Sequence, residues 1–97
     1  MNLQREPAEP PAVLYHGTAA RNQAMIWRDG LRKMGRHYVY LSVDVDAARM
    51  VGARYGAPVI FGLNAAAMHT NGHVFYRSAN GVWLTDEVPP RYLRSEV

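Results

Sequence analysis

Residues 14–18, Leu-Tyr-His-Gly-Thr, are the first candidate ligand-binding segment of this 97-residue sequence. The apolar start predicts a short buried strand, and His16 then lies at the mouth of that strand, directly before Gly17. Glycine has no side chain, so another molecule can approach the backbone closely at that point. Taken alone, a His-Gly pair is also typical of a plain turn.

Residues 36–42, Arg-His-Tyr-Val-Tyr-Leu-Ser, are the second candidate segment, because polar or aromatic residues alternate with aliphatic ones. In a strand, this alternation puts Val39 and Leu41 on one face. The opposite face then carries Tyr38, Tyr40 and Ser42. That face could bind a ligand, or it could be an exposed sheet surface that carries tyrosines.

Arg54 is the charged residue of the third segment, residues 51–56, whose other members are Val, Gly, Ala, Tyr and Gly. This glycine-flanked and apolar context predicts that the arginine is partly buried. A buried guanidinium needs an anion, which is either a phosphate of a ligand or a carboxylate in a structural ion pair. The segment therefore predicts a phosphate-facing side chain or an internal salt bridge.

Basic residues gather in one third of the chain. The net charge of +3 lies entirely in residues 31–60, which hold five basic and two acidic residues. Ten of the eleven basic residues are arginine, the side chain suited to bidentate contacts with phosphate. A GC-rich genome would explain the arginine count, but the clustering needs a further reason. We therefore expect a basic cleft for a phosphate-bearing ligand.

Several well-known signatures are missing from the sequence. There is no G-x-G-x-x-G motif, no P-loop and no G-x-S-x-G elbow of a serine hydrolase. Cysteine is absent and none of the four histidines belongs to an HExxH motif, so no metal site is expected. The lack of cysteine fits a cytoplasmic protein, and no apolar run approaches the roughly 18 residues of a membrane span. The N-terminus also lacks the apolar region of a signal peptide.

The apolar pattern, turns and caps predict one α+β domain at residues 12–97, preceded by a polar arm or linker at residues 1–11. The expected strands are residues 12–15, 38–41, 59–63, 74–76 and 82–84. The expected helices are residues 21–29, a second helix capped by Asp44 or Asp46, and an alanine-rich helix capped by Asn64.

The five short strands predict a small, strongly bent sheet, and three further signals support the predicted helix, turn and sheet end. The second helix carries an inward stripe at helical spacing, formed by Val45, Ala48, Val51 and Tyr55. The Asn80-Gly81 pair predicts a hairpin turn between the last two strands. Pro89 and Pro90 are expected to end the sheet and lead into a short tail.

Four segments in order resemble the C-terminal lobe of the RNA 2′-phosphotransferase family of the KptA type. They are residues 14–19, 36–42, 51–59 and 80–85, and the resemblance runs from about Pro11 to Leu93. It implies an ADP-ribosyltransferase-like fold, in which two short bent β-sheets and three short helices surround a cleft for NAD. It also implies that NAD is a co-substrate.

The resemblance implies a two-step reaction. The 2′-phosphate of an RNA, such as a tRNA splice junction, attacks the nicotinamide ribose and expels nicotinamide. A transesterification then leaves a 2′-hydroxyl on the RNA and a cyclic ADP-ribose phosphate. Because the leaving group is cationic and departs neutral, the site must orient the dinucleotide and stabilise charge rather than supply a strong base.

Roles for single residues follow from their positions in the resemblance. His16 would hydrogen-bond a ribose hydroxyl of NAD and Arg54 would hold phosphate charge, and these two are the expected catalytic residues. Tyr40 would pack on the nicotinamide ring, while Gly17 would offer its backbone to the carboxamide with help from Ser42. The complete set expected to bind the cofactor is His16, Gly17, Thr18, Tyr40, Ser42, Arg54 and Val82.

Two departures from the family pattern bear on the function. Members usually have a second histidine where this sequence has Tyr40, which resembles the broader ADP-ribosyltransferase pattern. The family's N-terminal winged-helix-like half, with an Arg-His pair and an Arg-x-x-x-Gly-His-Ser motif, has no counterpart here. Arg32, Lys33 and Arg36 are the nearby residues that could replace it, although loop charges are often only solvated. A separate RNA-binding lobe or partner chain is therefore an expected partner, beside NAD and phosphorylated RNA.

Two other functions also fit these residues. The first is ADP-ribose transfer to another acceptor, which would be a nucleic-acid end phosphate or a protein. The second is a truncated, non-catalytic lobe that binds NAD or only pairs with a partner chain. Both are motivated by the incomplete set of catalytic residues.

Overall fold

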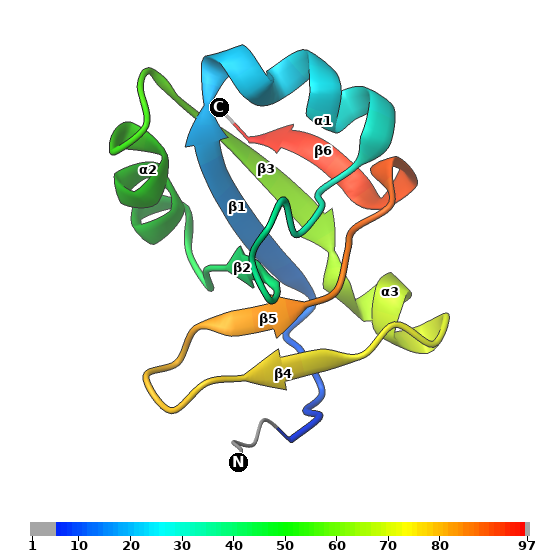
Figure 1. Ribbon diagram of the computed structural model, residues 1–97. Coiled ribbons are helices and arrows are strands. Elements are labelled where there is room, and N and C mark those ends of the chain that lie inside the picture. Colours follow the sequence, from blue (N-terminus) through cyan, green and yellow to red (C-terminus); the bar gives the residue numbers. More distant parts are fainter. Residues whose placement is uncertain (1–5, 97) are drawn as a thin grey trace.

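The structure, a computed structural model, describes residues 6–96 and contains two antiparallel sheets of three strands each (Figure 1). The first sheet has the order β1-β3-β6, with β1 at Val13–Ala19, β3 at Pro58–Asn64 and β6 at Leu93–Glu96. The second has the order β2-β5-β4, with β2 at Val39–Leu41, β5 at Trp83–Thr85 and β4 at Phe75–Arg77. The helices are α1 (Gln23–Asp29), α2 (Val45–Ala53) and α3 (Ala65–Thr70), with 3₁₀ turns at Ala20–Asn22 and Pro90–Tyr92. The predicted α+β class with three short helices is confirmed.

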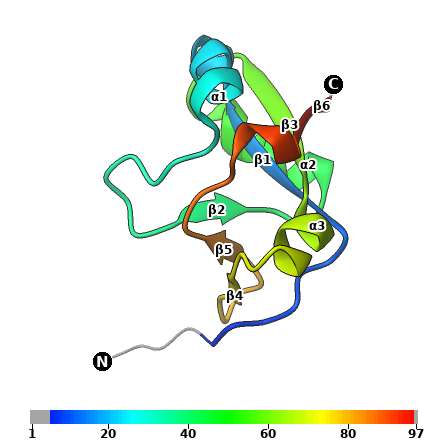
Figure 2. The ribbon, with the colours of Figure 1, turned by 90° about the vertical axis from the view of Figure 1, so that its right-hand side faces the viewer.

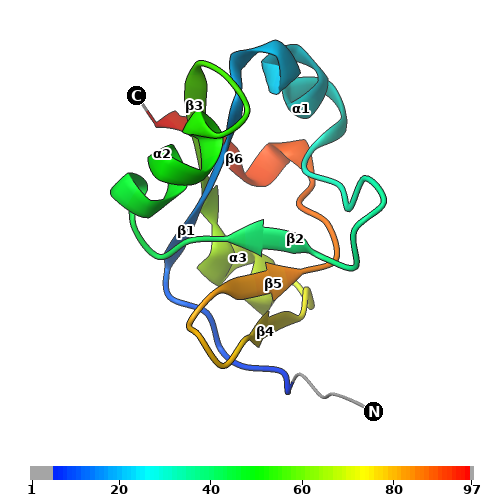
Figure 3. The same ribbon diagram turned by 60° about the vertical axis from the view of Figure 1, so that its left-hand side comes forward.

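A pair of main-chain hydrogen bonds joins the two sheets. The N–H of Tyr15 on β1 donates to the carbonyl of Ser42 at 2.9 Å, and the N–H of Ser42 donates back at 2.8 Å. This bridge fixes the end of β2 beside the middle of β1. In Figure 3 the strands of the second sheet run across the direction of β1, so the two sheets lie at a steep angle to each other.

Glycines let α2 lie directly against β1. A Cβ built on Gly17 would lie 1.7 Å from the carbonyl oxygen of Ala48, and one built on Gly52 would lie 2.9 Å from the carbonyl oxygen of Thr18. Any side chain at Gly17 would therefore push the helix off the strand. Close packing of α2 on β1 therefore requires glycine at position 17. The sequence had indicated a different role for Gly17, namely the close approach of a ligand to the backbone.

The core lies between the two sheets and is closed by α1 and α3. Alternation on β2 is as predicted, because Val39 and Leu41 are buried while Tyr40 is exposed. The bulkiest fully buried side chains include Leu14, Phe61, Leu63, Met68, Phe75 and Leu84. Each sheet buries one face in this shared core, which is how so short a chain positions its strands.

The predicted helix caps are confirmed. Asp44 begins α2 by accepting a hydrogen bond from the N–H of Ala47 at 2.7 Å, and Asn64 begins α3 by accepting from the N–H of Ala67 at 3.0 Å. Gly30 ends α1 with a φ of 81°, a backbone conformation that favours glycine.

Two predicted boundaries were wrong because pairing between distant strands decides them. The residues after Pro90 do not form a free tail, since β6 pairs with the outer edge of β3, with Ile60 opposite Glu96. β1 does not end before the His-Gly pair but continues to Ala19, with β3 opposite along its whole length. His16 therefore lies in the middle of the strand rather than at its mouth.

Among residues 6–96, the N-terminal arm and the loop between α1 and β2 are two segments without regular helix or strand. The described part of the predicted arm, residues 6–11, runs along β4, and the N–H of Ala8 donates to the carbonyl of Phe75 at 2.9 Å. The loop at residues 31–38 stands away from the body of the molecule between α1 and β2 (Figure 2). None of the helices in residues 6–96 has the length and apolar character needed to cross a membrane. The rest of the predicted arm, residues 1–5, lies outside the described residues.

Candidate active site

A cleft of about 320 Å³ opens between β1, α1, α2, β2 and the loop at residues 31–38. Its floor is the middle of β1, and α1 and α2 form two of its walls. Apolar side chains line its deeper part: Met25, Ile26, Leu31, Val39 and Val51. Ligand sites in proteins usually combine such an apolar lining with a few directed polar groups.

His16 is the directed polar group on the floor of the cleft. It is half-buried on β1, and its Nδ1 lies 2.9 Å from the main-chain oxygen of Tyr40. A carbonyl oxygen can only accept a hydrogen bond, so Nδ1 carries a proton. Burial lowers the pKa of the imidazole, the hydrogen bond to Tyr40 raises it, and the nearby charge of Arg36 lowers it again. Since the net shift is downward, the ring is neutral near pH 7 and its Nε2 is a hydrogen-bond acceptor.

The backbone of Gly17 offers a second polar edge. In an antiparallel pair, the main-chain groups of alternate residues point to the same side of the strand. The N–H and carbonyl of Tyr15 point away from β3, toward Ser42, and those of Gly17 point the same way. Gly17 lines the cleft, so its main-chain donor and acceptor are placed for a planar amide of a ligand.

Thr18 and Asn22 form a side-chain pair next to this edge. The Nδ2 of Asn22 donates to the Oγ1 of Thr18 at 3.0 Å, and both residues line the cleft. The amide oxygen of Asn22 and the hydroxyl hydrogen of Thr18 are not used in that bond. They provide an acceptor and a donor side by side.

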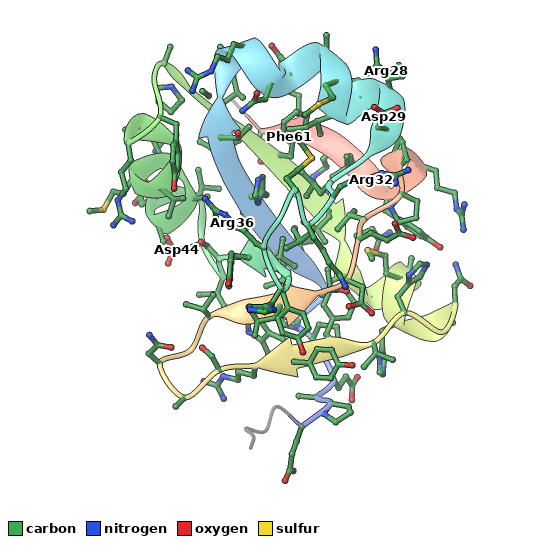
Figure 4. The ribbon with its side chains drawn as sticks, in the orientation of Figure 1. Arg28, Asp29, Arg32, Arg36, Asp44 and Phe61 are labelled. Carbon is green, nitrogen blue, oxygen red and sulfur yellow. The ribbon has the colours of Figure 1, made fainter. Side chains whose placement is uncertain are left out.

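Three side chains meet at the mouth of the cleft. The Cζ of Arg36, on the loop, lies 5.7 Å from the centre of the Tyr40 ring, and its Nη2 donates to the hydroxyl of Tyr55 at 3.3 Å. Tyr55 is also held from the other side, because Arg21 donates to its carbonyl oxygen at 2.6 Å. Figure 4 shows the Arg36 side chain reaching from the loop toward α2. The pKa of the Tyr55 hydroxyl is lowered, chiefly by the hydrogen bond from Arg36.

The cleft is strongly basic, as predicted. It is lined by Arg21, Arg32, Lys33 and Arg36, and by a single acidic residue, Asp29. Arg28 binds the carboxylate of Asp29 through two hydrogen bonds, and Lys33 pairs with Asp86 at 3.3 Å. Among residues 6–96, none of the three arginines that line the cleft has a carboxylate within ion-pair distance. The cleft therefore carries a net positive charge that an anionic ligand would neutralise.

The structure brings some of the expected site residues together and leaves others apart. His16, Gly17, Thr18 and Tyr40 line one cleft. Ser42, Arg54 and Val82 are not among the described residues that line it. Ser42 is half-buried beside the cleft through its bridge to Tyr15, and Val82 lies in the β4–β5 hairpin, where its N–H donates to the hydroxyl of Ser78 at 3.1 Å.

The predicted burial of Arg54 was wrong, because its side chain is exposed at the end of α2. Residues on a helix are separated by 100° per position. Gly52 faces β1, so Arg54 points to nearly the opposite side. The inward stripe of α2 was also only partly right, since Ala48 is buried while Tyr55 is 43% exposed at the mouth of the cleft.

Several residues of the cleft were missed by the sequence analysis. Arg21 and Asn22 line it but belong to none of the candidate segments, and Tyr55 lies in the segment at residues 51–56 but was not named as a site residue. A signal existed for Tyr55, since it lies one helical turn after Val51 and shares the face that looks into the cleft. No local signal exists for Arg21, because its position depends on how the 3₁₀ turn meets the end of α2.

The fold and the cleft define a small α+β domain with a basic ligand-binding cleft. The sequence model described as RNA 2′-phosphotransferase, Tpt1/KptA family, matches residues 1–87. The chain belongs to this family. Residues 6–96 contain no group of three or more His, Cys, Asp or Glu side chains that could hold a metal ion.

Curated relatives agree with the family match. A probable RNA 2′-phosphotransferase of Nostoc punctiforme is 54% identical over 94 residues, which are 97% of this chain and 52% of the relative. One of Streptomyces griseus is 57% identical over 93 residues, 96% of this chain and 49% of the relative. One of Hahella chejuensis is 52% identical over 93 residues, 96% and 50% of the two chains. The chain thus spans about half the length of the curated relatives that it matches.

Proposed function

We propose that this chain binds NAD in the basic cleft and takes part in removing the 2′-phosphate of an RNA, with release of nicotinamide. The observation that carries the proposal is the contact between His16 Nδ1 and the Tyr40 carbonyl, because it fixes the imidazole in a positive cleft that Tyr40 also lines and leaves Nε2 as the acceptor nitrogen of the ring. Family membership supplies the reaction class. The tRNA splice junction is the RNA that the resemblance suggests.

The residues of the cleft fit NAD in three respects. Arg21 and Arg32, which line the cleft and have no carboxylate partner among residues 6–96, suit the diphosphate. Tyr40 is 40% exposed as a residue, and its ring suits a flat aromatic group such as nicotinamide. The Nε2 of His16 can accept from a ribose hydroxyl, and the edge of Gly17 can pair with a carboxamide.

Bound NAD supplies the ADP-ribosyl group and a leaving group that departs neutral. The protein's part is then to hold and orient its two substrates and to keep water from the reacting carbon. His16 fixes the ribose through a ring that cannot rotate without losing its bond to Tyr40. The positive charge of the cleft stabilises the negative charge of the attacking phosphate. The protein has to remove no proton from a carbon or a hydroxyl in the first step, so that step needs no strong base.

Arg54 remains a predicted catalytic residue. Its guanidinium is exposed, yet its charge is a minor cause of the lowered pKa of Tyr55, after the hydrogen bond and charge of Arg36. Its positive charge therefore acts at the rim of the cleft. The Arg54→Ala variant should keep its unfolding free energy within about 0.5 kcal/mol, because the side chain is exposed. It should lose nicotinamide release, and unchanged release would show that Arg54 has no part in the reaction.

Release of nicotinamide tests the proposed function directly. The protein is incubated with NAD and an RNA that carries one 2′-phosphate, and the same RNA without that phosphate is the control. His16→Ala should lower the release, whereas His69→Ala, on the exposed side of α3, should not. No release with the phosphorylated RNA, even after addition of an N-terminal lobe from a relative, would refute the enzyme proposal.

Two further measurements separate the other functions that fit the sequence. A stable ADP-ribosylated product on a different acceptor would indicate that the second step is missing. Calorimetric binding of NAD without any turnover would indicate a non-catalytic lobe. Each result has its own readout, so the three functions are distinguishable.

A further inference from the structure

The guanidinium of Arg36 spans the mouth of the cleft between β2 and α2. It lies over the ring of Tyr40 at 5.7 Å and donates to the hydroxyl of Tyr55 at 3.3 Å. A tight turn aims it there, since the N–H of Arg36 donates to the carbonyl of Lys33 at 3.0 Å, and Met34 and Gly35 between them have positive φ. The base of the loop is anchored by two hydrogen bonds between Leu31 and Val88.

The partners of Arg36 are weak for a guanidinium. A tyrosine hydroxyl is a neutral acceptor, and 3.3 Å is long for a charge-assisted hydrogen bond. Among residues 6–96, no carboxylate lies within ion-pair distance of Arg36. A guanidinium has five donors, most of which these partners leave unused. A phosphate at the mouth of the cleft would offer stronger bonds than Tyr55 does.

The position of Arg36 indicates which phosphate it would meet. Arg21 precedes α1 and donates to the main-chain oxygen of Tyr55, and Arg32 follows α1. Arg36 instead lies over the ring of Tyr40 and is close enough to His16 for its charge to lower the pKa of that imidazole. In the proposed function, His16 and Tyr40 hold the nicotinamide riboside. Arg36 therefore lies at the reacting end, where the attacking group must enter, and not at the diphosphate.

We infer that Arg36 binds the 2′-phosphate of the RNA acceptor and leaves the hydroxyl of Tyr55 when that phosphate arrives. This inference rests on the proposed function, because that function defines which end of the cleft reacts. It assigns to the loop a phosphate contact that belongs to this lobe itself.

The test measures the preference for a 2′-phosphate by direct binding. Two short labelled oligoribonucleotides that differ in one internal 2′-phosphate are titrated against the whole chain by fluorescence anisotropy. The parent should bind the phosphorylated one more tightly. Arg36→Gln should lower that preference about tenfold, the effect of one lost charge-assisted hydrogen bond network. The slope of log affinity against log salt should fall by about 0.7 for the lost phosphate contact.

Three further variants separate phosphate binding from a structural role. Arg36→Lys keeps the positive charge but not the planar, bidentate donor geometry of the guanidinium. It should therefore keep the salt slope and lose part of the preference for the 2′-phosphorylated RNA. Arg49→Gln removes the same charge from an arginine of α2 that does not line the cleft, and it should match the parent. Tyr55→Phe removes only the hydroxyl that Arg36 is to leave, so it should preserve or strengthen the preference.

Several outcomes would overturn the inference. These are no preference in the parent, an unchanged preference in Arg36→Gln, or a loss in Tyr55→Phe as large as in Arg36→Gln. A loss of NAD affinity in Arg36→Gln equal to the loss for RNA would place Arg36 at the diphosphate instead. The proposed function fails separately, through absent nicotinamide release. NAD turnover that depends on His16, with an RNA preference indifferent to Arg36, would refute this inference alone.

Discussion

The imidazole of His16 on β1 is oriented by the main chain of Tyr40 on β2, not by its side chain. The bond of 2.9 Å crosses from one sheet to the other, beside the bridge between Tyr15 and Ser42. Any change that moves the sheets relative to each other therefore also turns the ring. The side chain of Tyr40 is free to vary without disturbing it.

The first prediction concerns the pH dependence of stability. Burial is the main cause of the lowered pKa of His16, so below its ordinary value of 6.5 the unfolded chain binds a proton that the folded chain resists. The stabilising contribution of neutral His16 is fully present above that pH and is lost as the pH falls toward the lower folded pKa. Urea unfolding at pH 7.5 and 5.5 should show the loss. His16→Gln should reduce it and His69→Gln should not, and equal pH dependence in all three proteins would contradict the assignment.

The second prediction separates the ring of Tyr40 from its main chain. Tyr40→Phe keeps an aromatic face and should bind NAD within about twofold of the parent. Tyr40→Ala removes the face and should weaken NAD about tenfold, the usual worth of one stacking contact. Both variants keep the carbonyl that holds His16 and should unfold within about 0.5 kcal/mol of the parent. Calorimetry measures the affinities, and equal affinities in both variants would show that no ring stacks there.

Local sequence patterns predicted those helices and strands that are determined by interactions between residues close together in the chain. Alternation around Tyr40 gave the two faces of β2, and the side chains of Asp44 and Asn64 marked the starts of two helices. Pairing of distant segments was beyond such patterns. β6 exists because β3 has a free edge, and nothing near Pro90 indicates that edge.

The candidate site was predictable to a similar degree. The clustering of charge predicted a basic cleft and the motifs predicted that His16 belongs to the site. The meeting of Arg36 with Tyr55 was not predicted, because it depends on the path of a loop. Arg54 was placed inside on the strength of its apolar neighbours. One of those neighbours, Gly52, lets the helix approach β1, and the arginine two residues later is left outside.

The third prediction concerns the close packing of α2 on β1. Gly17→Ala would bring a methyl group to 1.7 Å from the carbonyl oxygen of Ala48, so the helix must move. The unfolding free energy should fall by about 3 kcal/mol, at the high end for overpacking. Gly72→Ala is the matched control, since its φ of 97° is strained but a Cβ there meets nothing within 4 Å. That control should cost only about 1 kcal/mol. Equal losses in the two variants would mean that α2 does not lie so close.

The fourth prediction tests the cap that sets the start of α2, the helix that ends two residues before Tyr55. The carboxylate of Asp44 accepts from the N–H of Ala47 at 2.7 Å, whereas Asp46, two residues on, makes only an exposed ion pair with Arg49. Asp44→Ala should lower the unfolding free energy by about 1 kcal/mol, because a main-chain donor loses its partner. Asp46→Ala should change it by less than about 0.5 kcal/mol, since exposed ion pairs contribute little. Thermal or urea unfolding of the two variants measures the difference. A larger loss in Asp46→Ala would show that the helix begins elsewhere, and the alignment of Val51 and Tyr55 along the cleft would then need another explanation.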